Sequence, residues 1–281
     1  MKLRGTEKVV RGQRTVDGAG VSLVRVIGNR DVYDFDPFLM LDSFDSTNPD
    51  DYTAGFPWHP HRGIETITYL IRGKIEHMDS LGNKGTIEAG ESQWMTAGSG
   101  ILHQEMPIAS DRMLGFQLWL NLSKSEKMTH PAYLSITQDM IPVVLQDDAE
   151  IRVLAGKYKD AAGVMPRHIQ AGILDVSLPK GKKITLPTKP EETVFAFLIA
   201  GDAVINAHIL SEKSAVLFGA GDTVSIEATP EQDLRFILFS GKALHESVAW
   251  GGPIVMNTRD ELDLAFEELR NGTFIKSKPN L

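Results

Sequence analysis

The sequence contains no cysteine among its 281 residues, and this absence excludes three kinds of chemistry together. The protein cannot form disulfides, use a thiol nucleophile or bind a metal through thiolates. The lack of disulfides fits a reducing compartment, so we expect a cytoplasmic protein, or a nuclear one if its source is eukaryotic. Any metal site must then be built from imidazole and carboxylate ligands.

Basic residues and long apolar runs are also scarce. Lys and Arg number 29 against 37 Asp and Glu, which gives a net charge of -8 and argues against direct nucleic-acid binding. The longest apolar run, Val194 to Ala200, is too short to cross a bilayer. The first residues carry charge throughout and lack the apolar segment of a signal peptide. We therefore expect neither a nucleic acid nor a membrane as a partner.

Most of the chain consists of short runs rich in β-branched and aromatic residues, separated by Gly, Pro and Asn/Asp turns. Examples are residues 64–71, 92–95, 114–120, 151–154, 194–199 and 234–239. This pattern is typical of an all-β sandwich or barrel. Helices are expected at only two places. Ser123 with Glu126 predicts the start of a short helix, and Thr258 with Glu261 predicts a longer one that ends near Gly272.

A weak internal repeat predicts two copies of one β-module. Residues 69–73 and 89–92 are echoed by residues 197–201 and 220–223. The copies are expected to meet near residues 134–143, which predicts domains of residues 1–135 and 136–281. A gapless overlay sets Pro187, Lys189, Leu234 and Phe236 against His59, His61, His103 and Glu105. On this alignment the second copy has no metal ligands.

Potential metal ligands occur as two matched pairs, His59-Pro60-His61 and His103-Gln104-Glu105. In an extended strand the side chains at i and i+2 point to the same face, so each pair can present two ligands in one direction. Three imidazoles and one carboxylate suit Fe, Mn, Cu, Ni or Zn. Glu65, close to the first pair, is an alternative carboxylate ligand.

The histidine-rich stretches resemble the cupin superfamily and, within it, the pirin family. The matching segments are residues 36–39, 56–66, 93–107, 118–122 and 252–258, which extend over almost the whole chain. The resemblance implies a bicupin, with two tandem cupin-type barrels and a few short helices, one of them near the C-terminus. It implies one mononuclear divalent metal in the N-terminal domain, held by His59, His61, His103 and Glu105. Iron is the expected metal, with Mn, Cu, Ni, Co or Zn as alternatives, and Glu65 becomes at most a neighbour of the ligands.

The resemblance also implies a function. Pirin-like proteins include quercetin 2,3-dioxygenases, so we expect a metal-dependent dioxygenase that acts on a flavonol-like substrate with O2. Glu105 is then the candidate catalytic base, and Phe56, Met95 and Met106 are candidates for an apolar substrate site, with Trp58 beside them. The alternative is a non-enzymatic, iron-binding, redox-sensing protein that regulates a protein partner, in the manner of a transcriptional coregulator. An isomerase or hydrolase is compatible with an open metal site but has no sequence support.

The remaining candidates are expected to be structural. Arg62 is expected to pair with Glu65 or another carboxylate, and His77 to lie on the surface or in a loop. Gly98 and Gly100 are expected to provide backbone freedom for the turn before His103. Four histidines without a ligand partner two residues away are expected to take no part in a metal site: His130, His168, His208 and His245.

Overall fold

A computed structural model describes residues 2–277, which form two compact units. We call residues 14–34, 38–137 and 244–277 the histidine unit, and residues 2–13, 35–37 and 138–243 the companion unit. The chain changes unit between residues 137 and 138, close to the expected boundary between residues 135 and 136. The first residues, however, group with the second half of the chain, and the last residues group with the first half.

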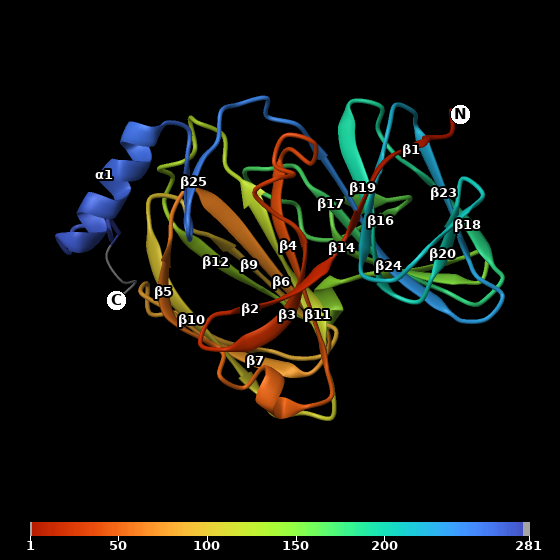
Figure 1. The fold of residues 1–281 in the computed structure, drawn as a ribbon, viewed down its shortest axis with the longest axis horizontal. Coiled ribbons are helices and arrows are strands. Elements are labelled where there is room, and N and C mark those ends of the chain that lie inside the picture. The colour runs from red at the N-terminus through yellow and green to blue at the C-terminus, as the bar shows by residue number, and fades with distance from the viewer. Residues whose placement is uncertain (1, 278–281) are drawn as a thin grey trace. The chain divides into compact units, whose positions relative to one another are not determined.

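The histidine unit contains a seven-stranded sheet, a four-stranded sheet and a short hairpin (Figure 1). The larger sheet has the order β12 (Ala132–Ile136), β9 (Ser92–Thr96), β6 (Ile64–Arg72), β11 (Met113–Asn121), β4 (Phe38–Ser46), β3 (Val21–Ile27) and β2 (Gln13–Asp17). The smaller sheet has the order β5 (Phe56–His61), β10 (Ile101–Ile108), β7 (Lys74–Asp79) and β8 (Lys84–Ile87). The hairpin joins β25 (Ala249–Gly251) to β26 (Ile254–Met256), and a 3-10 helix, η1, covers Pro49–Asp51.

The companion unit repeats this plan. Its seven-stranded sheet has the order β1 (Thr6–Arg11), β22 (Ser214–Phe218), β19 (Glu192–Ala200), β24 (Leu234–Lys242), β17 (Gly172–Leu178), β14 (Ala149–Ala155) and β13 (Val143–Gln146). Its four-stranded sheet has the order β18 (Lys183–Pro187), β23 (Thr223–Ala228), β20 (Ala203–Ile205) and β21 (His208–Leu210). A two-stranded ribbon, β15 (Lys157–Tyr158) with β16 (Ala161–Ala162), and the 3-10 helix η2 (Gln138–Met140) complete it. The expected all-β architecture of two related modules is confirmed.

The two sheet orders also show that the gapless overlay is wrong. In equivalent places β10 corresponds to β23, and β11 corresponds to β24. Leu234 and Phe236 lie on β24, so they are not the counterparts of His103 and Glu105. The error arises because Ala220–Thr223 leads into β23, whereas the similar Ala89–Ser92 leads into β9. The module is repeated, but the similar glycine-containing segments, residues 89–92 and 220–223, lie before strands that are not equivalent.

The corrected alignment explains why the companion unit has no histidine pair at this place. On β23 the buried apolar residues are Val224, Ile226 and Ala228, which pack in the apolar core of that unit. Val224 pairs with Leu186 on β18, and Ile226 pairs with Ile184. Aliphatic side chains thus occupy the strand pair that carries the histidines in the other unit.

Phe236 provides a test of this structural role, because its side chain is fully buried in the same apolar core. We expect Phe236→Ala to lower the free energy of unfolding by about 3–5 kcal/mol, the usual cost of removing a buried phenylalanine ring. The metal content of the folded variant should equal that of the unmodified protein. Chemical denaturation followed by elemental analysis measures both quantities, and metal loss from the folded variant would contradict the assignment.

The C-terminal helix is confirmed, and the other expected helix is not. Helix α1 (Arg259–Arg270) starts at a capping box formed by Thr258 and Glu261 and ends just before Gly272, whose φ is +71°. Residues 124–128 instead form turns, in which the Glu126 and Thr129 amides donate to carbonyls three residues earlier. Within residues 2–277, no helix has the length and apolar character needed to cross a membrane.

Candidate metal centre

Two adjacent antiparallel strands of the histidine unit carry both predicted ligand pairs (Figure 1). His103 on β10 lies opposite His59 on β5, and Ile101 lies opposite His61. The register shifts between His103 and Glu105, which marks a bulge next to the ligands. The i, i+2 spacing therefore places His59 and His61 on one face of β5, as the sequence predicted.

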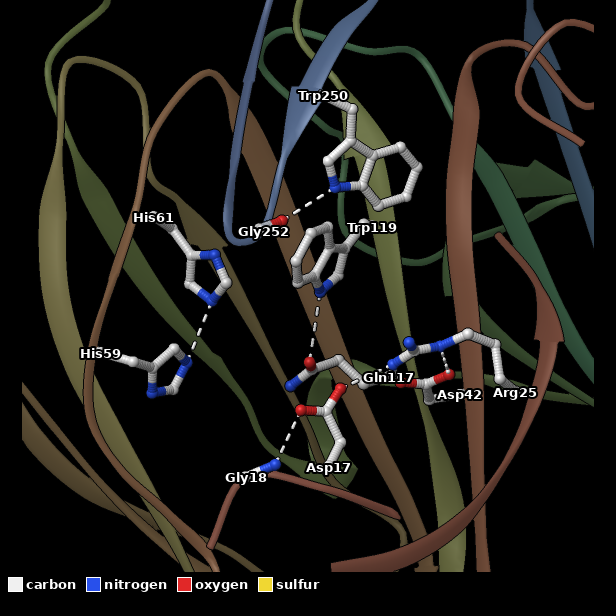
Figure 2. A network of polar contacts seen from close by, with 10 residues as sticks. All are labelled: Asp17, Gly18, Arg25, Asp42, His59, His61, Gln117, Trp119, Trp250 and Gly252. Carbon is white, nitrogen blue, oxygen red and sulfur yellow. Dashed lines mark hydrogen bonds and ion pairs between the residues drawn. The ribbon is translucent and has the colours of Figure 1, made fainter. Parts of the chain in front are cut away.

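The three histidines converge. One nitrogen from each of His59, His61 and His103 lies within 4.8 Å of the other two. Among residues 2–277, these three side chains are the group of His, Asp and Glu residues close enough together to hold a metal ion. The Nε2 atoms of His59 and His61 are 3.1 Å apart, and Figure 2 shows the two rings turned toward each other. His61 and His103 are buried, whereas His59 is half-buried and forms the more open side.

Backbone carbonyls determine which nitrogens of two of these rings face the centre. His59 Nδ1 lies 2.8 Å from the Pro57 carbonyl oxygen, and His61 Nδ1 lies 3.0 Å from the Pro253 carbonyl oxygen. A carbonyl only accepts, so each Nδ1 must carry the hydrogen. In the neutral rings both Nε2 atoms then present lone pairs to each other across 3.1 Å. Two lone pairs at that distance repel unless a cation lies between or beside them, so the rings suit a metal.

The third ring supports the same interpretation. His103 is fully buried, and neither of its ring nitrogens has a hydrogen-bond partner among the described residues. A buried polar group without a partner costs free energy, and a metal bond would remove that cost. Burial lowers the pKa of His103 well below its usual value, and the other histidines lower it further. The ring is consequently neutral and able to bind a metal near pH 7.

Burial also lowers the pKa of His61 to about 3, with His59 adding to the decrease and the Pro253 carbonyl opposing it. An unfolded histidine takes up a proton near pH 6.5, so between pH 6.5 and 3 the unfolded chain binds more protons than the folded chain. The contribution of His61 to the free energy of unfolding is therefore fully present above pH 6.5 and is lost as the pH falls toward 3.

We expect the chelator-treated protein to lose about 2 kcal/mol of unfolding free energy through His61 between pH 7 and pH 5. The matched variant His61→Leu removes the titrating ring and should lack that part of the decrease. Urea denaturation of both proteins at the two pH values measures the difference. Equal decreases in the two proteins would show that His61 does not remain neutral in the folded chain.

The fourth predicted ligand, Glu105, is buried on β10 but lies outside the converging group of histidines. Three donors contact its carboxylate. Gln93 Nε2 and Thr68 Oγ1 donate to Oε1 at 2.5 and 2.9 Å, and Gln117 Nε2 donates to Oε2 at 2.7 Å. An ionised carboxylate oxygen accepts about two bonds, so Oε2 retains capacity for one more partner. The geometry therefore leaves Glu105 able to bind a metal or a proton at Oε2.

A tryptophan sets the orientation of one of these donors. Trp119 Nε1 donates to Gln117 Oε1 at 3.2 Å (Figure 2). With its oxygen held in this way, Gln117 directs its amide nitrogen toward Glu105. The Trp119 ring also meets the His61 ring edge-on, with centroids 4.9 Å apart. A second indole, Trp250, packs beside Trp119 at 5.7 Å. Residue patterns alone do not predict these roles of Gln93, Gln117 and Trp119, because their contacts with Glu105 and His61 join different strands.

The candidate substrate residues lie in different surroundings. Met95 is fully buried on β9, in the apolar cluster that also contains Trp119. Phe56 is half-buried and packs against a different cluster, around Phe44. Met106 follows Glu105 on β10, so its side chain points to the opposite face of the strand. Trp58 is half-exposed. The structure brings Met95 near the aromatic neighbour of the site, but it does not gather the other residues there.

His77 corrects one expectation, because it is fully buried on β7 and lies neither on the surface nor in a loop. Its ring stacks on Tyr133 at 4.6 Å and lies 5.5 Å from the His103 ring, measured between centroids. His77 Nε2 is 3.5 Å from an oxygen of Asp79, which is buried on the same strand. The signal was present in the sequence, since His77 and Asp79 have the same i, i+2 spacing as the two ligand pairs.

The other neighbours of the site have structural partners. Arg62 pairs with a carboxylate as expected, but with Glu268 of α1, at 2.8 Å. Glu65 is buried on β6 and accepts a hydrogen bond from Thr96 at 2.7 Å. Gly98 and Gly100 have positive φ values of 49° and 135°, so the expected need for backbone freedom before His103 is confirmed. None of the four histidines expected to be outside the site belongs to the converging group.

Each of the two units has a sheet of seven strands and a sheet of four, and the histidine unit carries three converging histidines. These features define a protein of the cupin-type two-domain class. The model of the family described as pirin matches residues 20–120, and that of the pirin C-terminal cupin domain matches residues 173–275. The chain belongs to the pirin family.

Three similar proteins illustrate this relationship. A pirin-like protein of Caulobacter vibrioides is 41% identical over 98% of this chain and 100% of its own length. Pirin of Rattus norvegicus is 38% identical over 91% of this chain and 88% of its own length. The crystal structure of a quercetin 2,3-dioxygenase from Acinetobacter baumannii has a TM-score of 0.88 and 32% identity, and the match covers 97% of this chain and 98% of that one.

Proposed function

We propose that this protein is a metal-dependent dioxygenase of the quercetin 2,3-dioxygenase type, with a mononuclear iron held by His59, His61, His103 and Glu105. The observation that supports this most strongly is the 3.1 Å approach of the Nε2 atoms of His59 and His61, whose Nδ1 atoms both face backbone carbonyls. The similarity to the Acinetobacter baumannii quercetin 2,3-dioxygenase over nearly the whole chain supports the reaction class. Imidazole and carboxylate donors fit iron, and they also fit Mn, Co, Ni, Cu and Zn.

The chain contributes binding, orientation and proton transfer. The carbonyls of Pro57 and Pro253 hold two imidazoles in the tautomer that presents Nε2. A bound divalent metal supplies Lewis acidity, which lowers the pKa of a coordinated hydroxyl group. Glu105 is the acidic group among the four ligands, and its Oε2 atom has capacity for one further bond. It can therefore bind the metal or accept the proton of a flavonol 3-hydroxyl group, which makes it the general base in this proposal.

The substrate we propose is a planar aromatic molecule with an enolisable hydroxyl group, and its co-substrate is O2. Met95 and Trp119 provide apolar and aromatic surface in the cluster beside the histidines. Such surface favours a flavonol ring over a small polar acid. Met106, on the opposite face of its strand, contributes nothing to this side of β10.

The test combines metal analysis with oxygen consumption. The purified protein should contain about one metal per chain, and the iron-loaded form should consume O2 when a flavonol such as quercetin is added. Chelator-treated protein is the control and should consume none. If iron-loaded protein shows no uptake with any flavonol, the dioxygenase proposal fails. The better proposal would then be a metal-binding protein whose metal state is recognised by a protein partner.

A further inference from the structure

The hydrogen-bond acceptor of His61 comes from a distant part of the chain. Pro253 lies 192 residues after His61, in the turn between β25 and β26. Strand β26 follows this turn and lies beside Arg62, the residue after His61. The Val255 amide donates to the Arg62 carbonyl at 3.1 Å. The tautomer of His61 therefore depends on how the β25–β26 hairpin is held against the end of β5.

A buried lysine joins these two segments. Lys127 is 2% exposed, and its ammonium group donates to the Gly63 carbonyl at 2.8 Å, the Val255 carbonyl at 2.9 Å and Asn121 Oδ1 at 2.5 Å. Gly63 is two residues after His61, and Val255 is two residues after Pro253. One side chain thus links the turn after the ligand to the strand after its acceptor.

The backbones at Gly63 and Val255 pack so closely that few side chains other than Lys127 could join them. Gly63 has a φ of +77°, and a Cβ added there would lie 2.0 Å from the Val255 carbonyl oxygen. The two backbones therefore approach too closely for an apolar side chain to separate them. Two backbone carbonyls point at the same place, and a donor with several N–H groups is the group that satisfies both.

Holding an ammonium group here is costly, which argues that it has a specific role. Burial lowers the pKa of Lys127 to about 7, while Glu246 and Glu261 act in the opposite direction. A lysine is almost never this buried unless it is paired. In the protonated form its three N–H groups match three oxygen acceptors, so that form is fully hydrogen-bonded.

We propose that Lys127 is a positioning residue of the metal centre, which holds the Pro253 carbonyl against His61 Nδ1 and thereby keeps His61 Nε2 directed at the metal. Groups that orient a metal-binding histidine commonly change metal affinity by 10–100-fold when they are removed. This proposal rests on the metal site of the proposed function but does not require dioxygenase activity. It predicts an effect on metal binding by a residue that does not touch the metal.

The test compares Lys127→Met with Lys124→Met in the full-length protein. Methionine keeps an unbranched side chain, one heavy atom shorter than that of lysine, and removes the donors. Lys124 is an exposed lysine three residues earlier on the same turn, and it serves as the matched control. Competition between each protein and a chromogenic chelator for Co²⁺ gives the affinity of the folded fraction. We expect Lys127→Met to bind Co²⁺ about 10–100-fold more weakly, with an altered Co²⁺ absorption spectrum, and Lys124→Met to be unchanged.

A second measurement separates positioning from stability. Ring ¹⁵N shifts of His61 in the chelator-treated proteins should show the Nδ1–H tautomer in the unmodified chain and a mixture of tautomers in Lys127→Met. If that variant does not fold, Asn121→Ala, which removes only one of the three acceptors, should still show a smaller loss of affinity.

Failure of the unmodified protein to bind Co²⁺ would refute the metal site itself, and with it this proposal. The role of Lys127 alone would be refuted by a folded Lys127→Met variant with unchanged affinity and tautomer. If that variant cannot be obtained folded, unchanged affinity in Asn121→Ala would have the same consequence.

Discussion

Replacing both His59 and His61 by alanine is expected to reduce the bound metal from about one per chain to none. The two rings supply the Nε2 atoms that lie 3.1 Å apart, and no described neighbour can replace them, because the converging group contains only one further histidine. Two remaining ligands at most, His103 and Glu105, cannot hold a divalent ion against water. Elemental analysis of the purified variant, repeated after incubation with excess Fe²⁺ or Co²⁺ and desalting, measures the loss.

The control for this prediction is the pair His208→Ala and His245→Ala. Both side chains are exposed and lie outside the converging group, so the metal content of these variants should not change. Circular dichroism should show that the double variant of His59 and His61 retains its β-structure. A folded double variant with stoichiometric metal would mean that the ligands lie elsewhere.

The parts of the site that sequence could predict are those set by local geometry. Alternation along a strand puts i and i+2 on one face, so the pairs on β5 and β10 could be recognised without knowledge of the fold. The same rule applied to His77 and Asp79 would have predicted two more inward-facing polar groups on β7. The expectation of a surface or loop position for His77 left this spacing out of account, and the buried position on β7 contradicts it.

The remaining features depend on contacts between residues far apart in the chain. Gln93, Thr68 and Gln117 reach Glu105 from three different strands, and Pro253 reaches His61 across 192 residues. No periodicity encodes such contacts. The repeat illustrates a different difficulty, because a glycine-rich turn precedes many strands. Similar turns before β9 and β23 were therefore aligned although these strands are not equivalent.

The most informative single substitution is Glu105→Gln, which we expect to lower flavonol-dependent oxygen uptake by about a hundredfold or more, the usual scale for the loss of a general base. Glutamine preserves the size of the side chain and can offer an oxygen to a metal, but it cannot accept a proton near neutral pH. The variant should therefore retain iron while its turnover falls. Iron content and the initial rate of oxygen uptake, measured on the same preparation, separate these effects.

The surroundings of Glu105 determine how this result is interpreted. Its carboxylate accepts from three donors, so an amide at this position must turn its own NH2 group toward at least one of them. Some loss of stability is therefore expected. Glu65 on β6 is another buried carboxylate, so the variant Glu65→Gln is the control for a general loss of stability. We expect Glu65→Gln to reduce turnover far less, because the proposed mechanism gives Glu65 no part in proton transfer and its Oε1 accepts from Thr96. Equal decreases in the two variants would assign the effect to general destabilisation. Full turnover by an iron-loaded Glu105→Gln protein would exclude the base role, leaving the three histidines as the essential part of the site.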